Sequence, residues 1–438
     1  MSLVRPGALD ARVERFAQAL RAARPRVLGL LADNGPAWVI ADLAAQKAGV
    51  VLVPLPAFFT AAQLAHAVGA SGMDALVGAP LPGFAPAGDI EGLPFHRRQA
   101  QAAEIPPGTA KITYTSGTTG APKGVPLSAA QQSAVAGALA QATAALGLRR
   151  HLCLLPLAVL LENVAGVYAP LRAGMEVCVP PLAEVGMRGS SGFDARACLA
   201  ALARWRPDSV ILLPQMLAAL CAVLERGVPP PASLKLAAVG GAKVSPALLA
   251  RARALGVPAY EGYGLSECAS VVSLNLPGAD RPGSAGRPLA HARVSIEEHE
   301  IVVNQTRTGD LGRIDADGYL YIEGRRKHVL ITSFGRNVSP EWPEAELLAG
   351  RAIAQAAVFG EARARLCALI VPAPGASREA VDAQVRAANE RLPDYARIGA
   401  WLRADEPFTP QNGLATANGR ARRDALWHAY GDRLDAVS

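Results

Sequence analysis

The chain has few aromatic residues and no closely spaced cysteine pair. Aromatic side chains make up 5% of its 438 residues, so alanine, leucine and valine must fill most of the interior. Six cysteines are present, with no C-x-x-C pair among them, and most lie in apolar surroundings. This pattern argues against a disulfide framework and predicts reduced core cysteines in a cytoplasmic protein.

Lysine is also scarce. The net charge of +7 comes from arginine, because the chain contains six lysines: Lys47, Lys111, Lys123, Lys235, Lys243 and Lys327. The basic residues are dispersed and no basic run is interleaved with aromatics, so we expect solvated charged faces and no nucleic-acid partner.

No secretory or membrane-spanning segment is expected. Residues 1–5 lack the apolar region of a signal peptide. Residues 127–148 are the least charged run, but they contain glutamines and helical periodicity. We therefore expect a buried or amphipathic helix there, with no transmembrane segment.

The order of apolar segments predicts an α/β fold. A chain of this length should divide into two or more domains. Apolar strands alternate with helices in the first 80 residues, as expected for a parallel sheet with helices on its faces. The expected strands are 26–31, 50–53 and 75–77, and the expected helices are 37–48 and 59–68, the second opened by Thr60 as an N-cap.

The remaining segments extend this pattern. Residues 80–109 are rich in proline, glycine and alanine and are expected to form a connector. Further expected segments are a helix at 129–145, apolar strands at 152–155, 209–213 and 237–239, and a short polar strand at 294–303. Residues 328–438 should form a small α+β unit with strands 356–359 and 366–371 and a helix at 378–391.

A loop of small residues after residues 112–114 has the composition of an anion cradle. Glycines let the main chain approach a ligand, so that several N–H groups can converge on phosphate oxygens. Hydroxyl residues add donors, and a lysine adds a compact positive charge. The loop residues are Thr115, Ser116, Gly117, Thr118, Thr119 and Gly120, followed by Pro122 and Lys123.

The spacing differs from the G-x-x-x-x-G-K-[ST] phosphate loop, and such composition also occurs in plain surface turns. The uninterrupted small polar residues directly after a strand favour the cradle. The segment closely resembles the signature loop of the adenylate-forming (AMP-binding) superfamily, which includes acyl-CoA synthetases, carrier-protein adenylation domains and luciferases.

Two further blocks extend the resemblance. A buried strand ends in Gly240-Gly241-Ala242, where a flat base can lie against the backbone. The block that follows, Glu261-Gly262-Tyr263-Gly264, offers an aromatic face for adenine, and Glu267 offers a hard oxygen ligand. The resemblance implies that these residues bind ATP and that Thr115 and Glu267 hold Mg²⁺.

The last two residues that the resemblance assigns to nucleotide binding are Asp310 and Arg325. Asp310 can accept from two ribose hydroxyls, and Arg325 can reach ribose or the α-phosphate with its planar fork. Each is alternatively a loop-capping group. Lys327 corresponds to the hinge of the family, so the expected domains are an AMP- and acyl-binding domain, 1–326, and a small mobile domain, 327–438.

Three regions bear on which branch of the family the chain resembles. Val159 stands where many members have a histidine of the acyl pocket, and Glu162-Asn163 matches the long-chain acyl-CoA synthetase variant of that segment. The segment is alternatively the start of a buried helix. Residues 332–340 resemble the thiol-tunnel loop of the same branch. Only residues 302–307 separate the Glu300-Ile301 strand from the Thr308-Gly-Asp block, so the chain is a compact member.

Arg420 departs from the family pattern. It stands where relatives carry a lysine that bridges the acyl carboxylate and the α-phosphate, and no lysine follows Lys327. The wider, planar guanidinium of arginine does not replace the slim ammonium of lysine between two anions. We therefore expect slowed or repositioned adenylation, with the thioester step less affected. A solvated surface arginine is the alternative.

The blocks occur in the family's order along the whole chain. The resemblance implies an AMP-forming acid–thiol ligase with Lys123, Glu267 and Arg420 as catalytic residues and ATP, Mg²⁺ and coenzyme A as ligands. Rival interpretations are transfer to an acyl carrier protein and a weakly active ATP- or AMP-binding protein. Residues near 157–164 and 268–274 are apolar, which suits a fatty acid, the favoured substrate, but also an aryl acid.

Overall fold

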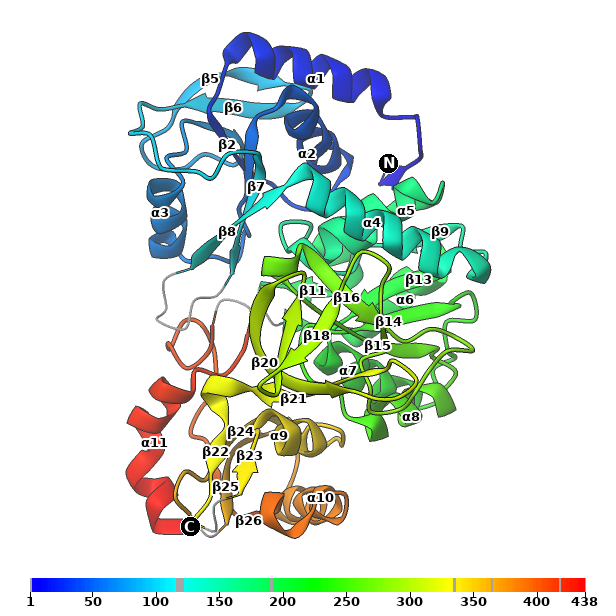
Figure 1. Ribbon diagram of the computed structural model, residues 1–438, viewed down its shortest axis with the longest axis vertical. Coiled ribbons are helices and arrows are strands. Elements are labelled where there is room, and N and C mark those ends of the chain that lie inside the picture. The colour runs from blue at the N-terminus through cyan, green and yellow to red at the C-terminus, as the bar shows by residue number, and fades with distance from the viewer. Residues whose placement is uncertain are drawn as a thin grey trace.

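The computed structural model describes residues 2–115, 122–189, 192–333, 336–363, 365–416 and 419–437. Figure 1 shows an elongated molecule with one sheet at the top, a second in the middle and a small domain at the foot, where the C-terminus lies. The α/β fold expected from the sequence is confirmed: a large N-terminal domain of sheets flanked by helices precedes a smaller α+β domain.

The first sheet has seven strands in the order β5-β6-β4-β2-β3-β7-β8, and its centre, β4-β2-β3-β7, is parallel. All five residues of its central strand are buried, as expected for a strand covered on both faces. The strands are β2 (Val27–Leu31), β3 (Val51–Pro54), β4 (Ala75–Gly78), β5 (Ala85–Ile90), β6 (Leu93–Arg97), β7 (Thr109–Thr115) and β8 (Lys123–Ser128).

The helices of this part are α1 (Asp10–Ala23), α2 (Pro36–Ala48) and α3 (Ala61–Ala70). Thr60 caps α3, as expected, and forms a reciprocal capping box with Gln63. The connector expected over residues 80–109 contains a hairpin of β5 and β6 that the sequence did not predict. Its proline and glycine content concealed these strands, of which β5 lies at the edge of the sheet, where both residues are tolerated.

The second sheet has eight strands in the order β1-β10-β9-β13-β14-β15-β16-β17. They are β1 (Leu3–Val4), β9 (Arg150–Leu152), β10 (Glu176–Cys178), β13 (Ser209–Leu212), β14 (Leu236–Val239), β15 (Ala259–Leu265), β16 (Ser270–Leu274) and β17 (Arg287–Pro288). A separate two-strand ladder joins β11 (Met187–Arg188) to β12 (Gly192–Phe193).

The helices around the second sheet are α4 (Ala129–Thr143), α5 (Ala169–Arg172), α6 (Ala195–Trp205), α7 (Pro214–Leu224) and α8 (Pro246–Ala254). A π-helix at Glu162–Tyr168 precedes α5. Among the helices that the structure describes, none has the length and apolar character needed to cross a bilayer.

A third, antiparallel sheet consists of β18 (Val294–Glu297), β19 (Glu300–Val303), β20 (Thr306–Ile314) and β21 (Leu320–Arg325). The single strand expected at 294–303 is therefore a hairpin. Glu298 and His299 turn the chain with left-handed backbone angles, φ +51° and +64°. No glycine or proline at this turn signalled it in the sequence.

The small domain contains both strands and the helix expected for it. Its three-stranded sheet runs β24-β25-β26, and β26 and α11 were not predicted. Its elements are β22 (Leu330–Ile331), β23 (Asn337–Val338), α9 (Glu341–Leu347), β24 (Ile353–Phe359), β25 (Leu366–Pro372), α10 (Arg378–Glu390), β26 (Ile398–Arg403) and α11 (Arg423–Val437). No disulfide joins the six cysteines, all of which lie among the described residues, and five of them are buried.

A buried polar cluster crosses between the two large sheets. Lys111 of β7 lies 2.7 Å from an oxygen of Asp42 in α2 and donates to Asn163 and Tyr168 of the π-helix. Asn163 and Tyr168 each donate to the other oxygen of Asp42, at 2.8 and 2.7 Å. Burial lowers the pKa of Lys111, and the Asp42 carboxylate opposes that shift. The buried Lys111 ammonium and Asp42 carboxylate therefore each need the other to stay charged without a large energetic cost.

We predict that Lys111→Met lowers the free energy of unfolding by about 3–5 kcal/mol, because it leaves the Asp42 carboxylate buried without a cation. Urea unfolding measures the change. Lys47→Met is the matched control: Lys47 pairs with Glu14 at an exposed site, so its loss should cost at most about 1 kcal/mol. Equal effects of the two substitutions would contradict the account.

Candidate functional site

Elements of all three N-terminal sheets meet at one place. The short 3₁₀ turn Ser266–Cys268 contacts both β8 of the first sheet and β20 of the third. It follows β15, which belongs to the second sheet. Lys123, Glu267 and Asp310 therefore come from three separate sheets and lie on neighbouring elements.

The two ends of the glycine-rich loop are close together. Thr115, the last residue of β7, pairs with Lys123, the first residue of β8, and the Thr115 hydroxyl lies 3.4 Å from the Lys123 carbonyl oxygen. Lys123 is exposed and Thr115 is half-buried. The loop residues between them named above, Ser116, Gly117, Thr118, Thr119 and Gly120, lie outside the described residues.

The turn after β14 lies beside the tyrosine block. Val239 pairs with Glu261 of β15, so Gly240 follows directly against Gly262. A Cβ on Gly240 would lie 3.0 Å from the Gly262 carbonyl oxygen. Gly241 has φ +80° and, like Ala242, is exposed. The structure thus presents bare backbone at the position where a base is expected to lie.

The buried Glu261 side chain is hydrogen-bonded to the backbone that follows this turn. The Val244 N–H donates to its carboxylate, and its second oxygen is buried with no partner among the described residues. Burial raises the pKa of Glu261 to about 7, although the Lys243 ammonium lowers it. The Lys243 ammonium itself donates to the Ile322 carbonyl at 2.5 Å, which ties the turn to β21.

Tyr263, Asp310 and Arg325 form one hydrogen-bonded group. Asp310 and Arg325 are register partners on β20 and β21, and the Arg325 Nε lies 2.8 Å from one Asp310 oxygen. The Tyr263 hydroxyl donates to the other oxygen at 2.7 Å. Desolvation and the Asp310 charge raise the pKa of Tyr263, so its hydroxyl stays protonated and available as a donor.

Glu267 fits a hard divalent cation. It is exposed on the turn that contacts β8, the strand that begins at Lys123. A free carboxylate and a threonine hydroxyl at the end of a neighbouring strand are oxygen donors of the kind that Mg²⁺ accepts. Both leave room for water and phosphate oxygens, which usually complete magnesium coordination.

Lys327 lies in the exposed 3₁₀ turn Arg326–His328. Partial desolvation and the charge of Arg325 lower its pKa. The next residue, His328, contacts Glu341 of α9 at 2.5 Å, and Ser339 donates to the same carboxylate at 2.7 Å. Burial alone would raise the pKa of Glu341, but its hydrogen bonds and nearby cations bring it to about 2.

His328 and Glu341 were not singled out from the sequence. Neither belongs to a spaced motif, and 12 residues separate them in the printed chain. Their pairing depends on how the small domain packs against the turn at Lys327, which the local sequence does not specify.

Arg420 reaches from the small domain to the glycine turn. Its guanidinium donates to the Gly241 carbonyl at 2.5 Å. Two hydrogen bonds to Thr416 close the turn that carries Arg420. The Thr416 hydroxyl accepts from the Arg420 N–H at 3.1 Å, and the Thr416 N–H donates to the Arg420 carbonyl at 2.7 Å. Arg420 is exposed to solvent, but desolvation by the surrounding protein and the charge of Arg325 lower its pKa, whereas Asp310 raises it. Arg420 thus lies at the edge of the site, with its guanidinium against the glycine turn.

The two apolar segments expected to bind the acyl group lie in one cluster. Leu160 and Val164 from the π-helix region pack with Val271 and Leu274 of β16, together with residues of β8 and α4. Val159 is half-buried. An apolar wall therefore lies between the strand that follows the glycine-rich loop and the strand that follows Glu267.

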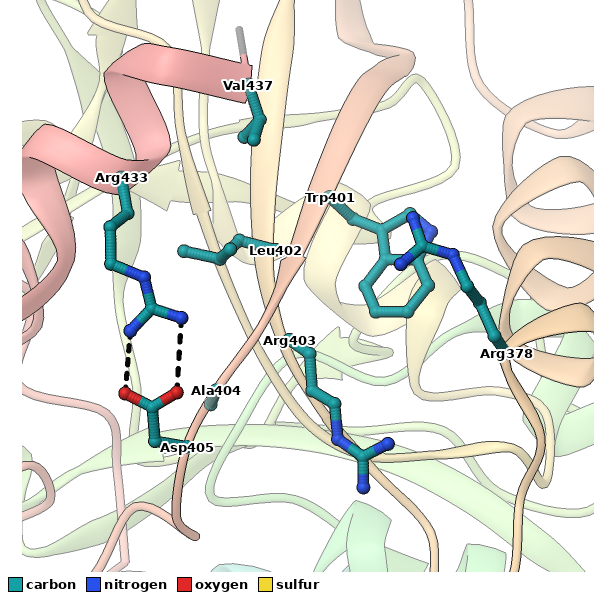
Figure 2. Close-up of a pocket in the computed structure, with 8 residues that line it drawn as sticks. All are labelled: Arg378, Trp401, Leu402, Arg403, Ala404, Asp405, Arg433 and Val437. Atoms are coloured by element: carbon teal, nitrogen blue, oxygen red, sulfur yellow. Dashed lines mark hydrogen bonds and ion pairs between the residues drawn. The ribbon is translucent and has the colours of Figure 1, made fainter.

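A groove on the small domain is separate from these residues. It lies between α10, β26 and α11, and none of the site residues named above lines it (Figure 2). Arg433 and Asp405 pair within it through two hydrogen bonds of 2.6 and 3.1 Å, and the Arg378 guanidinium lies over the Trp401 ring. Because these groups satisfy one another, we assign the groove no role in the site.

Two family profiles match the chain. The sequence profile of the AMP-binding enzyme family matches residues 7–325, and that of the AMP-binding enzyme C-terminal domain matches residues 327–437. A 2-succinylbenzoate–CoA ligase of Bacillus velezensis is 31% identical over 340 residues, which cover 68% of this chain and 65% of the relative. The chain thus spans less than two thirds of that relative's length.

Solved structures show the same fold. An anthranilate CoA ligase, AuaEII, in complex with anthranoyl-AMP has a TM-score of 0.77 at 21% identity, covering 95% of this chain and 90% of that one. The o-succinylbenzoate coenzyme A synthetase of Bacillus subtilis, in complex with ATP and magnesium ion, has a TM-score of 0.73 at 25% identity, covering 95% and 93%. Because the family profile matches well over half of the chain, this chain belongs to the AMP-binding enzyme family.

Proposed function

We propose that the protein activates a carboxylic acid with ATP as an acyl-adenylate and transfers the acyl group to a thiol. The observation that carries the proposal is the contact of Arg420 with the Gly241 carbonyl, beside the Tyr263–Asp310–Arg325 group. It brings a positive charge from the small domain to the residues suited to nucleotide binding.

In the first step a carboxylate oxygen of the acid attacks the α-phosphorus of ATP. A new P–O bond forms, the bond to the β-phosphate oxygen breaks, and pyrophosphate leaves. Thr115, Lys123 and the loop between them stabilise the departing anion, while Tyr263 and Asp310 hold adenine and ribose. The Arg420 guanidinium neutralises charge between the acyl carboxylate and the α-phosphate. Positioning and charge neutralisation supply the catalysis, without a side-chain nucleophile.

Glu267 and Thr115 are the residues that would hold Mg²⁺. When bound, the cation neutralises phosphate charge and helps orient the leaving pyrophosphate. The Bacillus subtilis synthetase, which was solved with ATP and magnesium ion, supports ATP and Mg²⁺ as ligands by likeness.

In the second step the thiol sulfur attacks the acyl carbon, the bond to the AMP oxygen breaks, and the thiol proton passes to solvent. We propose coenzyme A as the acceptor, because the similar Bacillus proteins are named CoA ligases. Transfer to a carrier-protein thiol is the rival acceptor. We further propose domains 1–326 and 327–438, with rotation at Lys327 between the steps.

The apolar wall around Val164 and Val271 suits a hydrophobic acid. The fatty acid expected from the sequence is one candidate. The named substrates of similar proteins, 2-succinylbenzoate and anthranilate, are aromatic acids and favour an aryl acid. We propose an aryl acid as the first class to test and a fatty acid as the second.

The test is pyrophosphate release from Mg-ATP across a panel of aryl and fatty acids, with and without coenzyme A. We expect release that requires one class of acid, together with a thioester when coenzyme A is present. A thioester that forms only on an added carrier protein would favour the rival acceptor. ATP binding without release for any acid would overturn the ligase proposal for these acids.

We predict that Arg420→Ala slows acid-dependent adenylation by about 10²–10³-fold, the usual effect of losing one charge contact in a water-excluded site. Arg420→Lys should exceed the wild-type rate, because the slim ammonium fits between two anions. Pyrophosphate exchange measures both variants. Arg422→Ala is the matched control, because Arg422 donates to Gly413 within the small domain.

Thioester formation from supplied acyl-adenylate should change much less in Arg420→Ala than adenylation does. Equal losses in the two half-reactions would contradict a specific role in adenylation. Equal losses in Arg420→Ala and Arg422→Ala would point to general damage of the small domain.

A further inference from the structure

A second cluster of reactive side chains lies in the core, apart from the proposed active site. His151 of β9, Cys153 just after it and Glu162 at the start of the π-helix each offer one ligand atom, and these atoms lie within 4.8 Å of one another. The exposed fractions of the three residues are 3%, 0% and 0%. The proposed acid activation uses none of them.

The distances suit a small tetrahedral ion. His151 Nε2 and a Glu162 oxygen are 3.0 Å apart. Zinc bonds of about 2.0 Å to nitrogen or oxygen and 2.3 Å to sulfur place the ligand atoms of a tetrahedral site roughly 3.3–3.8 Å from each other. The three ligand atoms lie within 4.8 Å of one another and would have to shift relative to each other to reach that geometry.

The groups that usually orient metal ligands are also present. The other ring nitrogen of His151, Nδ1, lies 3.0 Å from the Ser209 hydroxyl oxygen, on the neighbouring parallel strand β13. The Leu155 N–H donates to the second Glu162 oxygen at 3.0 Å. The His151 and Glu162 side chains are thus each held by a second partner, as metal ligands often are.

Gly166 leaves the space that the cluster needs. A Cβ at this position would lie 2.1 Å from the Glu162 oxygen and 2.9 Å from His151 Nε2. The Cys153 thiol donates to the Gly166 carbonyl oxygen at 3.7 Å. The π-helix brings Glu162 and Gly166 to the same side of the cluster, and such helices occur often at functional sites.

Charge balance favours a divalent cation here. The Glu162 carboxylate is fully buried, and among the described residues its one ion-pair partner is His151. A buried carboxylate without a full positive charge is unfavourable. A divalent ion together with the Glu162 carboxylate, a Cys153 thiolate and a neutral His151 sums to zero charge. A set of nitrogen, sulfur and oxygen ligands is typical of zinc.

We propose that His151, Cys153 and Glu162 form a structural Zn²⁺ site that fixes the π-helix to β9. Binding releases the Cys153 proton to solvent and requires the His151 tautomer with hydrogen on Nδ1, which then donates to Ser209. Because the ligands are buried, zinc enters while the chain folds. The site is separate from the Mg²⁺ assigned to Glu267, and the π-helix that it holds also carries Val164 of the apolar wall.

The test is elemental analysis of the full chain, produced without a metal-affinity tag and washed briefly with chelator to remove surface ions. We expect about one zinc per chain in the wild type and in Cys198→Ala, a matched control because Cys198 is a buried cysteine outside the cluster. Cys153→Ala and Glu162→Gln should lose most of it and should unfold at a lower temperature than the control.

Production with Co²⁺ in the growth medium gives a second readout. A cobalt–thiolate absorption band in the wild type that Cys153→Ser lacks would support the site even if another variant fails to fold. A folded wild-type protein with zinc no higher than in Cys153→Ala, and with no cobalt band, would overturn the proposal. The cluster would then be a hydrogen-bonded group of Ser209, His151 and Glu162 alone.

Discussion

The relative position of the two large sheets depends on a buried charge cluster at their boundary. Lys111 lies on β7, four residues before Thr115, and it is bonded to Asp42 above the first sheet and to Asn163 in the π-helix beside the second. The strand that leads into the glycine-rich loop is therefore fixed against the segment that carries the apolar wall. A shift of one sheet would separate Lys123 from Glu267, because these residues belong to different sheets.

The small domain completes the site from the opposite side. Arg420 is held by a turn that Thr416 closes, and its guanidinium reaches Gly241 at the end of a parallel strand. His328 and Glu341 join the same domain to the turn at Lys327. In the orientation seen here, the Arg420 guanidinium therefore lies beside the glycine turn.

Much of the fold followed from local sequence, because buried parallel strands are short apolar runs and Thr60 is a strong helix start. The failures occurred where local signals conflict with tertiary context. The β5–β6 hairpin at residues 85–97 contains proline and glycine, and the turn at Glu298 and His299 uses non-glycine residues with left-handed angles. The site blocks could be identified because each is contiguous. The Lys111 cluster joins residues far apart in sequence, and the His151 cluster joins residues that form no contiguous motif.

The most direct test of the account is a crystal structure with an unreactive acyl-adenylate analogue. Arg420 should leave the Gly241 carbonyl and donate to the atoms that replace the acyl carboxylate and α-phosphate, while Tyr263 stacks on adenine and Asp310 accepts from ribose. An analogue bound with Arg420 directed into solvent would contradict the central claim that this arginine carries the adenylation charge.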